Sequence, residues 1–197
     1  MIPRIEQKAE LSLSNYSIAI NWLYKNKFNL IYPERIVSSI YFDNFKMESY
    51  IDTLEGNTPR RKLRIRSYGK NAFDNLANKY KLETKLSGEF YRSKSQKEIY
   101  DLETFLKNGI VDSQYGICFP SAKITYVREY YGYKNLRVTI DKSIEYENLK
   151  YKSRIFREEN LVLEIKTSIN ENLTIIRNFF EFPRSKFSKY ERAIQSF

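Results

Sequence analysis

The chain has 197 residues and carries 34 Lys and Arg against 24 Asp and Glu, a formal net charge of +10. This excess indicates an anionic partner: nucleic acid, a phosphorylated metabolite, a polyanion or an acidic membrane. Because the chain has no histidine and a single cysteine, Cys118, it offers no catalytic triad of the common type, no His/Cys zinc site and no internal disulfide. We expect Cys118 to be a buried small hydrophobic residue.

The sequence also bears on domain organisation and location. No apolar run approaches 18 residues, and the start, MIPRIEQKAEL, has no signal-peptide core. We therefore expect a soluble, cytoplasmic protein that does not insert into a membrane. The length and the lack of repeats, low-complexity tracts or linkers predict a single domain over 1–197.

Hydrophobic periodicity predicts a mixture of strands and helices. In chain order, alternation predicts strands at 2–11, 36–43, 60–69, 79–87, 122–133, 135–142 and 161–168. Helical spacing predicts helices at 15–27, 96–107, 171–181 and 188–196, and a weaker one at 44–54. Strands joined by hairpins and broken by helices indicate an α+β fold on a mostly antiparallel sheet.

The stretch RRKLRIRSYGK, residues 60–70, shows a feature that recurs along the chain. Arg60, Lys62, Arg64 and Arg66 share one face of the predicted strand, while leucine and isoleucine share the other. Six strands divide in this way, with cations and an occasional carboxylate on the charged face. One explanation is a half-exposed sheet whose wet face is basic. The alternative, favoured by the number of strands, is that the charged faces surround the interior of a closed sheet, where an anion must neutralise them.

The motifs RxExK, SIYFDN, RRKLRIRSYG, LETK, ITYVREYY, LRVTID, LVLEIK and FPRSKFSKYERAI stand in an order that resembles a known family. It is the polyphosphate polymerase domain of the vacuolar transporter chaperone (VTC) family, one of the triphosphate tunnel metalloenzymes related to the CYTH proteins. The resemblance spans residues 4 to about 194. It implies an antiparallel eight-stranded closed β-barrel with flanking helices, whose basic interior holds the triphosphate of a nucleotide and then a growing phosphate chain.

The resemblance, together with the strand pattern, assigns site residues. Those expected to act on the reacting phosphates are Arg64, Arg66, Lys85, Arg128, Arg137 and Lys189. Those expected to bind phosphates are Lys8, Lys62, Lys94, Lys166 and Lys186. The family's metal-binding glutamate corresponds to Glu164, and Glu6 and Glu83 could assist it.

These residue types suit phosphoryl transfer, which needs charge neutralisation and positioning more than covalent chemistry and so requires no histidine. A carboxylate among cations can hold Mn²⁺ or Mg²⁺, which take oxygen ligands and bridge phosphates. The alternative for Glu164 and Glu6 is a plain salt bridge to a neighbouring lysine or arginine.

The expected function is a metal-dependent polyphosphate polymerase that transfers the γ-phosphoryl group of ATP onto inorganic polyphosphate and releases ADP. Three alternatives stay open: a triphosphate or nucleoside triphosphate hydrolase using the same site, a non-catalytic polyphosphate-binding module, and a nucleic-acid-binding protein. The expected partners are ATP and polyphosphate, without nucleic acid. Eukaryotic members of the family add a phosphate-sensing domain and a membrane-spanning segment, which we expect this chain to lack. A separate membrane partner and the oligomeric state stay open.

Overall fold

The structure is a computed structural model that describes residues 4–69, 73, 79–89, 91–150, 154–168 and 180–197. Its residue contacts form two compact units. Unit 1 comprises Met1–Arg35, Tyr126–Ile144 and Arg157–Phe187, and unit 2 comprises Ile36–Thr125, Glu145–Phe156 and Ser188–Phe197. The single domain over 1–197 stays a prediction.

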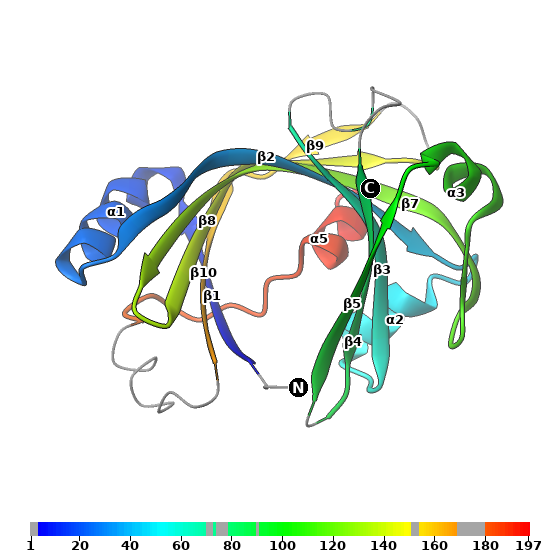
Figure 1. The fold of residues 1–197 in the computed structure, drawn as a ribbon, viewed down its shortest axis with the longest axis horizontal. Helices are drawn as coiled ribbons and strands as arrows, with labels where there is room; N and C mark the ends of the chain where they lie inside the picture. Colours follow the sequence, from blue (N-terminus) through cyan, green and yellow to red (C-terminus); the bar gives the residue numbers. More distant parts are fainter. Residues whose placement is uncertain (1–3, 70–72, 74–78, 90, 151–153, 169–179) are drawn as a thin grey trace. The chain divides into compact units, whose positions relative to one another are not determined.

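Figure 1 labels the helices and strands in chain order, and each is assigned to its unit. Unit 1 holds β1 (Arg4–Ser12), a 3-10 turn (Leu13–Asn15), α1 (Tyr16–Lys25) and β10 (Asn160–Ser168). Unit 2 holds α2 (Glu48–Glu55), β3 (Arg60–Tyr68), β4 (Tyr80–Ser87), β5 (Arg92–Ile99), α3 (Leu102–Asn108), β6 (Ile110–Asp112) and α5 (Lys189–Gln195). Residues of both units contribute to β2 (Asn29–Asp43), β7 (Gly116–Tyr133), β8 (Leu136–Asn148) and β9 (Ile155–Arg157).

The antiparallel, mostly β architecture with a few helices is confirmed, but the closed eight-stranded barrel is wrong. In the parts of the chain that the structure describes, the sheet has ten strands: eight follow one path in the order β1-β10-β8-β7-β2-β3-β4-β5, and β6 and β9 pair beside it with β7 and β8. Within the described residues, β1 pairs only with β10 and β5 only with β4, so the sheet is not closed.

The two outer strands show why the sheet stays open. On β1, the carbonyl of Lys8 accepts a hydrogen bond from the Ser185 N–H at 2.8 Å, so a segment that follows β10 covers this edge. On β5, polar residues occupy both faces, with Lys94 and Gln96 on one side and Ser95 and Lys97 on the other. A strand without an apolar face is typical of a sheet edge.

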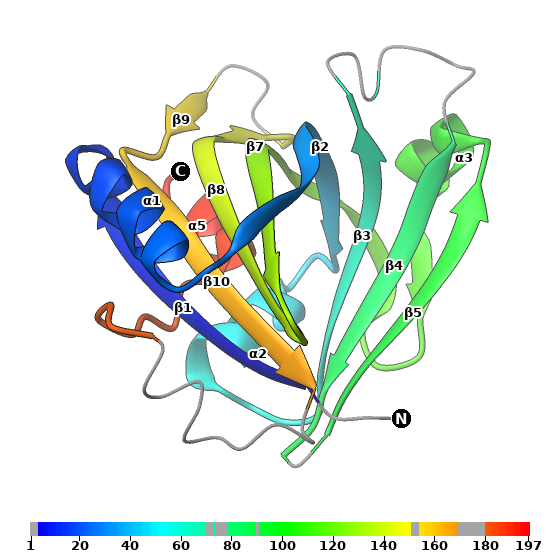
Figure 2. The ribbon, with the colours of Figure 1, turned by 60° about the vertical axis from the view of Figure 1, so that its left-hand side comes forward.

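The core of unit 1 lies between α1 and the apolar face of β1, β10 and β8. Trp22 of α1 stacks on Phe28 with 5.6 Å between ring centroids, and Leu163 and Ile140 of the sheet are fully buried in the same cluster. Figure 2 shows α1 lying across β1 and β10. The helix predicted over 15–27 is thereby confirmed as α1. Its packing leaves the opposite, charged face of these strands for the site.

The core of unit 2 is a second cluster, in which Phe42, Leu63 and Ile65 are buried with apolar side chains from α3 and β6. The helix predicted over 96–107 is partly wrong, because residues up to Ile99 continue β5 and α3 begins only at Leu102. The helices predicted over 44–54 and 188–196 correspond to α2 and α5. The one predicted over 171–181 lies almost wholly outside the described residues.

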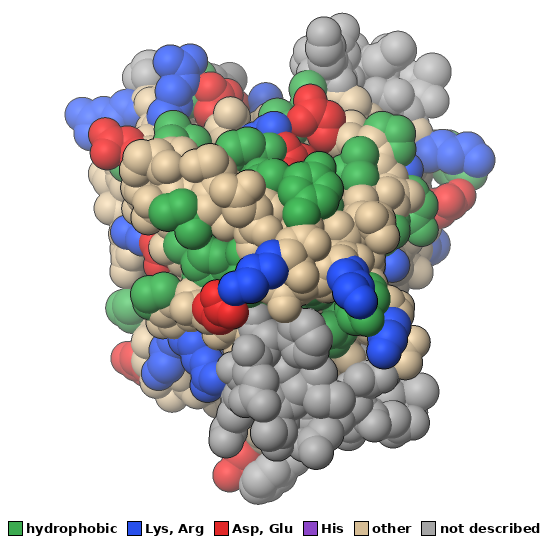
Figure 3. Space-filling view, turned by 90° about the vertical axis from the view of Figure 1, so that its left-hand side faces the viewer, with side chains coloured by type: hydrophobic (Ala, Val, Ile, Leu, Met, Phe, Trp, Pro, Cys, Tyr) green, Lys and Arg blue, Asp and Glu red, His purple; other side chains and the backbone are tan. Residues whose placement is uncertain are grey.

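The helices bear on the expectation that the chain does not insert into a membrane, and the surface bears on the expected anionic partner. In the described parts of the chain, no helix has both the length and the apolar character to span a bilayer. On the side where α1 lies, lysine and arginine side chains are dispersed among hydrophobic and acidic ones (Figure 3). The positive charge drawn on this face therefore does not form one continuous patch.

Candidate active site

The structure gathers most of the predicted site residues into two clusters, one in each unit. In unit 2, β3 pairs with β4 and β4 with β5, so that Arg64 is opposite Glu83, Lys62 is opposite Lys85, and Lys85 is opposite Lys94. Directly paired residues of an antiparallel sheet point to the same face. These residues and Arg66 form what we call the β3 cluster: Lys62, Arg64, Arg66, Glu83, Lys85 and Lys94.

Glu83 is the central carboxylate of the β3 cluster. Its side chain is almost fully buried, with Arg64 Nη2 at 2.7 Å from Oε2 and Lys94 Nζ at 2.5 Å from Oε1, while Arg66 Nη1 is 3.7 Å from Oε2. Burial alone raises the pKa of the Glu83 carboxyl, but the charges of Arg64, Arg66 and Lys94 outweigh it and lower the pKa to about 2. Glu83 therefore stays ionised and holds three cations in place.

Positive charge is nevertheless in excess around Glu83. Burial and the charges of Arg64 and Arg66 lower the pKa of Lys94, in spite of its contact with Glu83. Three cations, Arg64, Arg66 and Lys94, thus contact one carboxylate. Such an arrangement favours an additional anion, because like charges at this spacing repel one another.

Two further elements of unit 2 contact the β3 cluster. From β2, Tyr41 accepts a hydrogen bond from Arg64 Nη1 at 2.8 Å, and Ser39 Oγ accepts one from Arg66 Nε at 3.2 Å. At the start of α5, Ser188 Oγ accepts one from Lys62 Nζ at 3.0 Å. The next residue, the predicted Lys189, lies close enough to Tyr41 to influence its pKa. The sequence analysis did not identify Tyr41, since its contact depends on the pairing of β2 with β3.

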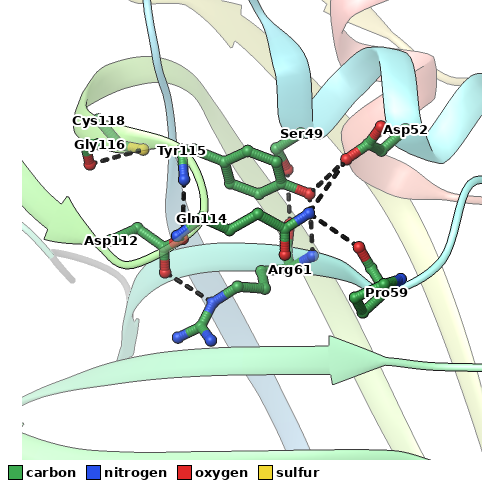
Figure 4. Close-up of polar contacts among 9 residues, drawn as sticks. All are labelled: Ser49, Asp52, Pro59, Arg61, Asp112, Gln114, Tyr115, Gly116 and Cys118. Carbon is green, nitrogen blue, oxygen red and sulfur yellow. Dashed lines mark hydrogen bonds and ion pairs between the residues drawn. The ribbon is translucent and has the colours of Figure 1, made fainter.

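Strand alternation directs Arg61 to the other face of β3, away from the cluster. Its Nε donates to Asp112 Oδ2 at 2.7 Å, and its backbone N–H donates to the Tyr115 hydroxyl, which itself donates to Asp52 Oδ2 at 2.8 Å. Figure 4 shows these contacts together with those of Gln114 and Ser49. We infer that Arg61 ties β3 to α2 and to the β6–β7 turn and takes no part in the site.

In unit 1, the predicted residues lie on the face of the sheet opposite α1. Lys8 of β1 pairs with Glu164 of β10, and Glu6 pairs with Lys166. Arg128 of β7 reaches the same face through Asp141 of β8, which pairs with Val162 of β10. We call this set the β10 cluster: Glu6, Lys8, Arg128, Asp141, Glu164 and Lys166.

Two carboxylates of the β10 cluster converge on one ammonium group. Lys166 Nζ is 3.4 Å from Glu164 Oε1 and 3.5 Å from Glu6 Oε1. Burial alone raises the pKa of Glu164, but the charges of Lys166 and Lys8 outweigh burial and the opposing charge of Glu6, so that the pKa lies below its usual range. Lys8 Nζ also donates to the Phe187 carbonyl at 2.8 Å. Glu164 and Glu6 therefore both form the salt bridge to a neighbouring lysine that the sequence analysis gave as the alternative to metal binding.

Arg128 is held by a carboxylate that the sequence analysis did not identify as part of the site. Its Nη2 is 2.7 Å from Asp141 Oδ2 and its Nε contacts Oδ1, in a two-pronged pair. Its guanidinium also lies 5.1 Å from the Tyr126 ring centroid. Burial alone lowers the pKa of Arg128, but the charge of Asp141 and its hydrogen bonds raise it well above the ordinary value. The pair holds a charged, oriented arginine on the face that carries Glu164.

Two predicted residues of unit 1 lie at the margin of the β10 cluster. Arg137 pairs with Lys166 across β8 and β10 but is exposed, and Lys186 is exposed in the segment before α5. Their positions allow contact with a ligand, but neither belongs to the network around Glu164.

The residues of the β10 cluster fit a divalent cation. The described residues include no group of three or more Asp, Glu, His or Cys side chains arranged to hold a metal. Mg²⁺ and similar ions, however, commonly bind one or two carboxylates and complete their shell with water and substrate phosphates. Glu164 and Glu6 provide two such carboxylates, and their convergence on Lys166 Nζ shows that both can approach a single cation.

Comparisons with known proteins identify the family of the chain and its fold. The family model for the VTC domain matches residues 4–115 and 113–197. A search of curated proteins gives no match.

Solved structures share the fold at low sequence identity. A candidate adenylyl cyclase from Hippeastrum, described as having a dominant triphosphatase activity, has a TM-score of 0.58 at 17% identity, and the match covers 98% of this chain and 96% of that one. Candidate adenylate cyclases from Vibrio parahaemolyticus (TM-score 0.58, 11% identity, 98% of each chain) and Bacillus halodurans (0.59, 14%, 95% of this chain and 94% of that one) have the same fold.

Proposed function

Because the chain belongs to the VTC domain family, within the triphosphate tunnel metalloenzymes, we propose that it is a metal-dependent polyphosphate polymerase. In the proposed reaction, the γ-phosphoryl group of ATP passes to the terminal oxygen of a polyphosphate chain, and ADP leaves. The observation that carries the proposal is the β3 cluster, in which Arg64, Arg66 and Lys94 all contact the buried carboxylate of Glu83 and two further lysines lie on the same face. A chain of phosphates supplies the missing negative charge at regular spacing.

Each cluster, taken by itself, has residues that suit phosphoryl transfer. Arg64 and Arg66 present guanidinium groups held by Glu83, and Lys62, Lys85 and Lys94 add ammonium groups on the same face, so the β3 cluster binds and orients phosphate oxygens. Lys189 extends this set from α5. In the β10 cluster, Arg128 and Lys8 bind phosphate oxygens beside Glu164. Arg137, Lys166 and Lys186 complete the proposed phosphate-binding residues of unit 1.

A divalent metal, Mn²⁺ or Mg²⁺, is part of the proposal, with Glu164 and Glu6 as its protein ligands. When bound, it would neutralise charge on the phosphates and bridge them. The protein's own residues contribute by fixed positioning: Asp141 orients Arg128, and Glu83 orients Arg64, before substrate arrives. Preorganised cations of this kind stabilise the charge that spreads over the transferred phosphoryl group.

A hydrolase that releases orthophosphate from a triphosphate is the second candidate. The observation that favours it is the shared fold with the Hippeastrum protein described as a triphosphatase. The same residues would serve, with water in place of the polyphosphate chain as acceptor.

The proposal for the polymerase also includes a cytoplasmic location, ATP as the nucleotide and a single domain over 1–197.

The test is incubation of the purified protein with ATP and Mn²⁺, with separate measurement of polyphosphate length, ADP and orthophosphate. We expect chain growth with ADP release, lost in Arg64→Ala and Glu164→Gln and retained in Glu89→Gln, which changes an exposed carboxylate in the β4–β5 turn. Orthophosphate without chain growth identifies the hydrolase. Polyphosphate binding that survives Glu164→Gln in a protein with no turnover of either kind identifies a binding module and rejects both enzymes.

A further inference from the structure

Tyr41 is a buried hydroxyl whose hydrogen bonding is incomplete. Its side chain lies on the same face as the β3 cluster, because Tyr41 pairs directly with Arg64 across β2 and β3. Only 7% of the residue is exposed. Its oxygen accepts the hydrogen bond from Arg64 Nη1 at 2.8 Å. Since a guanidinium can only donate, the phenolic proton of Tyr41 is still available for an acceptor.

Within the described part of the chain, no acceptor for this proton is found, although buried donors nearly always have one. The charged groups with the largest influence on the pKa of Tyr41 are cations, Arg64 and Arg66 from β3 and Lys189 from α5. Burial alone raises the pKa of Tyr41, but these charges and the hydrogen bond from Arg64 outweigh it and lower the pKa below its usual range. The surroundings are therefore those of a site for an anion.

The ring of Tyr41 is held in place, so its hydroxyl oxygen cannot move toward a more distant partner. Tyr190 of α5 stacks on it with 5.1 Å between centroids and an interplanar angle of 11°. Tyr190 is fixed in turn, because its hydroxyl donates to Asp43 Oδ2 at 2.6 Å. The backbone carbonyl of Tyr41 also accepts a hydrogen bond from Ser121 Oγ at 3.0 Å.

From this geometry we propose that Tyr41 is a phosphate-binding residue, whose hydroxyl donates a hydrogen bond to an oxygen of the phosphate held by Arg64, Arg66 and Lys189. The inference rests on the proposed function, since it adds a ligand to the same site. It assigns Tyr41 a distinct role, because a neutral donor fixes the direction of a phosphate oxygen without adding to the positive charge. Inorganic tripolyphosphate provides the chemistry that this group recognises.

The first test measures tripolyphosphate binding by calorimetry in EDTA, so that the cations and Tyr41 act without metal. Tyr41→Phe keeps the stacked ring and removes the hydroxyl. We expect affinity to fall about tenfold, the usual effect of losing one hydrogen bond to a charged group. Tyr24→Phe, on the exposed side of α1, serves as control and should bind like the wild type. Equal affinity of Tyr41→Phe and wild type overturns the inference.

A second variant distinguishes a Tyr41 hydroxyl that donates a hydrogen bond to phosphate from one that only accepts the hydrogen bond of Arg64. Replacement of Tyr41 by 3,5-difluorotyrosine makes the hydroxyl a better donor and a poorer acceptor while it keeps the ring and the oxygen. At a pH where this phenol remains protonated, tripolyphosphate should bind as tightly as to the wild type or more tightly. Weaker binding shows that Tyr41 acts only as an acceptor for Arg64 and overturns the inference. If the wild type itself does not bind tripolyphosphate, the proposed function is rejected. This result differs from one in which the wild type binds and only the role of Tyr41 is rejected.

Discussion

Replacement of Glu83 by glutamine tests whether one buried carboxylate holds the β3 cluster together. The substitution keeps the size of the side chain and removes its charge, so that Arg64, Arg66 and Lys94 lose their shared partner. Stability should fall at neutral pH, because three cations then repel one another across a largely buried site.

The magnitude follows from the pKa of Glu83, which these cations lower from 4.5 to about 2 against the effect of burial. A shift of this size corresponds to about 3 kcal/mol of stabilisation when the carboxyl is ionised. Lys94 is 46% exposed at its side chain, so solvent screens part of the interaction. We therefore expect Glu83→Gln to lower the free energy of unfolding by about 2 kcal/mol at pH 7.

The pH dependence provides an independent check. A lowered pKa in the folded state means that the stabilisation is complete above pH 4.5 and is lost as the pH falls toward 2. Urea unfolding of the wild type and of Glu83→Gln, followed by circular dichroism at a series of pH values, should give two curves that converge in acid. Glu89→Gln is the matched control. Equal stability at pH 7, or a difference that persists unchanged at pH 3, would refute this explanation.

Three other outcomes follow from the contacts of single side chains. Burial raises the pKa of the Cys118 thiol to about 12. A disulfide reagent at pH 8 should therefore label Cys118 only after denaturation. Rapid labelling of the native protein would contradict its buried position. Asp141→Asn leaves the largely buried Arg128 without its carboxylate and should cost about 3 kcal/mol in urea unfolding. Ser188→Ala removes the hydroxyl that accepts from the Glu191 N–H at the start of α5 and should lower stability by about 1 kcal/mol, whereas no change would show that the cap is dispensable.

The charged faces of the strands could be predicted from sequence because alternation is a local property. Lys62, Arg64 and Arg66 point to one side of β3 whichever strands lie beside it. The sequence could not show that Glu83 would be the centre of their network, because that depends on the register of three strands. The same holds for Tyr41, which reaches Arg64 through the pairing of β2 with β3 and is fixed by α5.

The errors in the predicted fold have a similar origin. β5 was missed because RSKSQKEI lacks an apolar face, and its pairing with β4 comes from the neighbouring strand, not from its own pattern. Closure of the sheet depends on whether its two outer strands can exchange hydrogen bonds. On β1, the Ser185 N–H donates a hydrogen bond to the Lys8 carbonyl instead. These residues are 177 positions apart, and no local pattern in the sequence indicates their contact.

The contact between Asp43 and Tyr190 joins residues that are 147 positions apart. During synthesis on the ribosome, β2 therefore emerges long before the helix that fixes Tyr41 against it. Contacts of such long range slow folding, since a large loop must close before they form. The strands of the β3 cluster must pair while their cations still lack this support, and maturation of the cluster should be among the latest steps as the nascent chain folds.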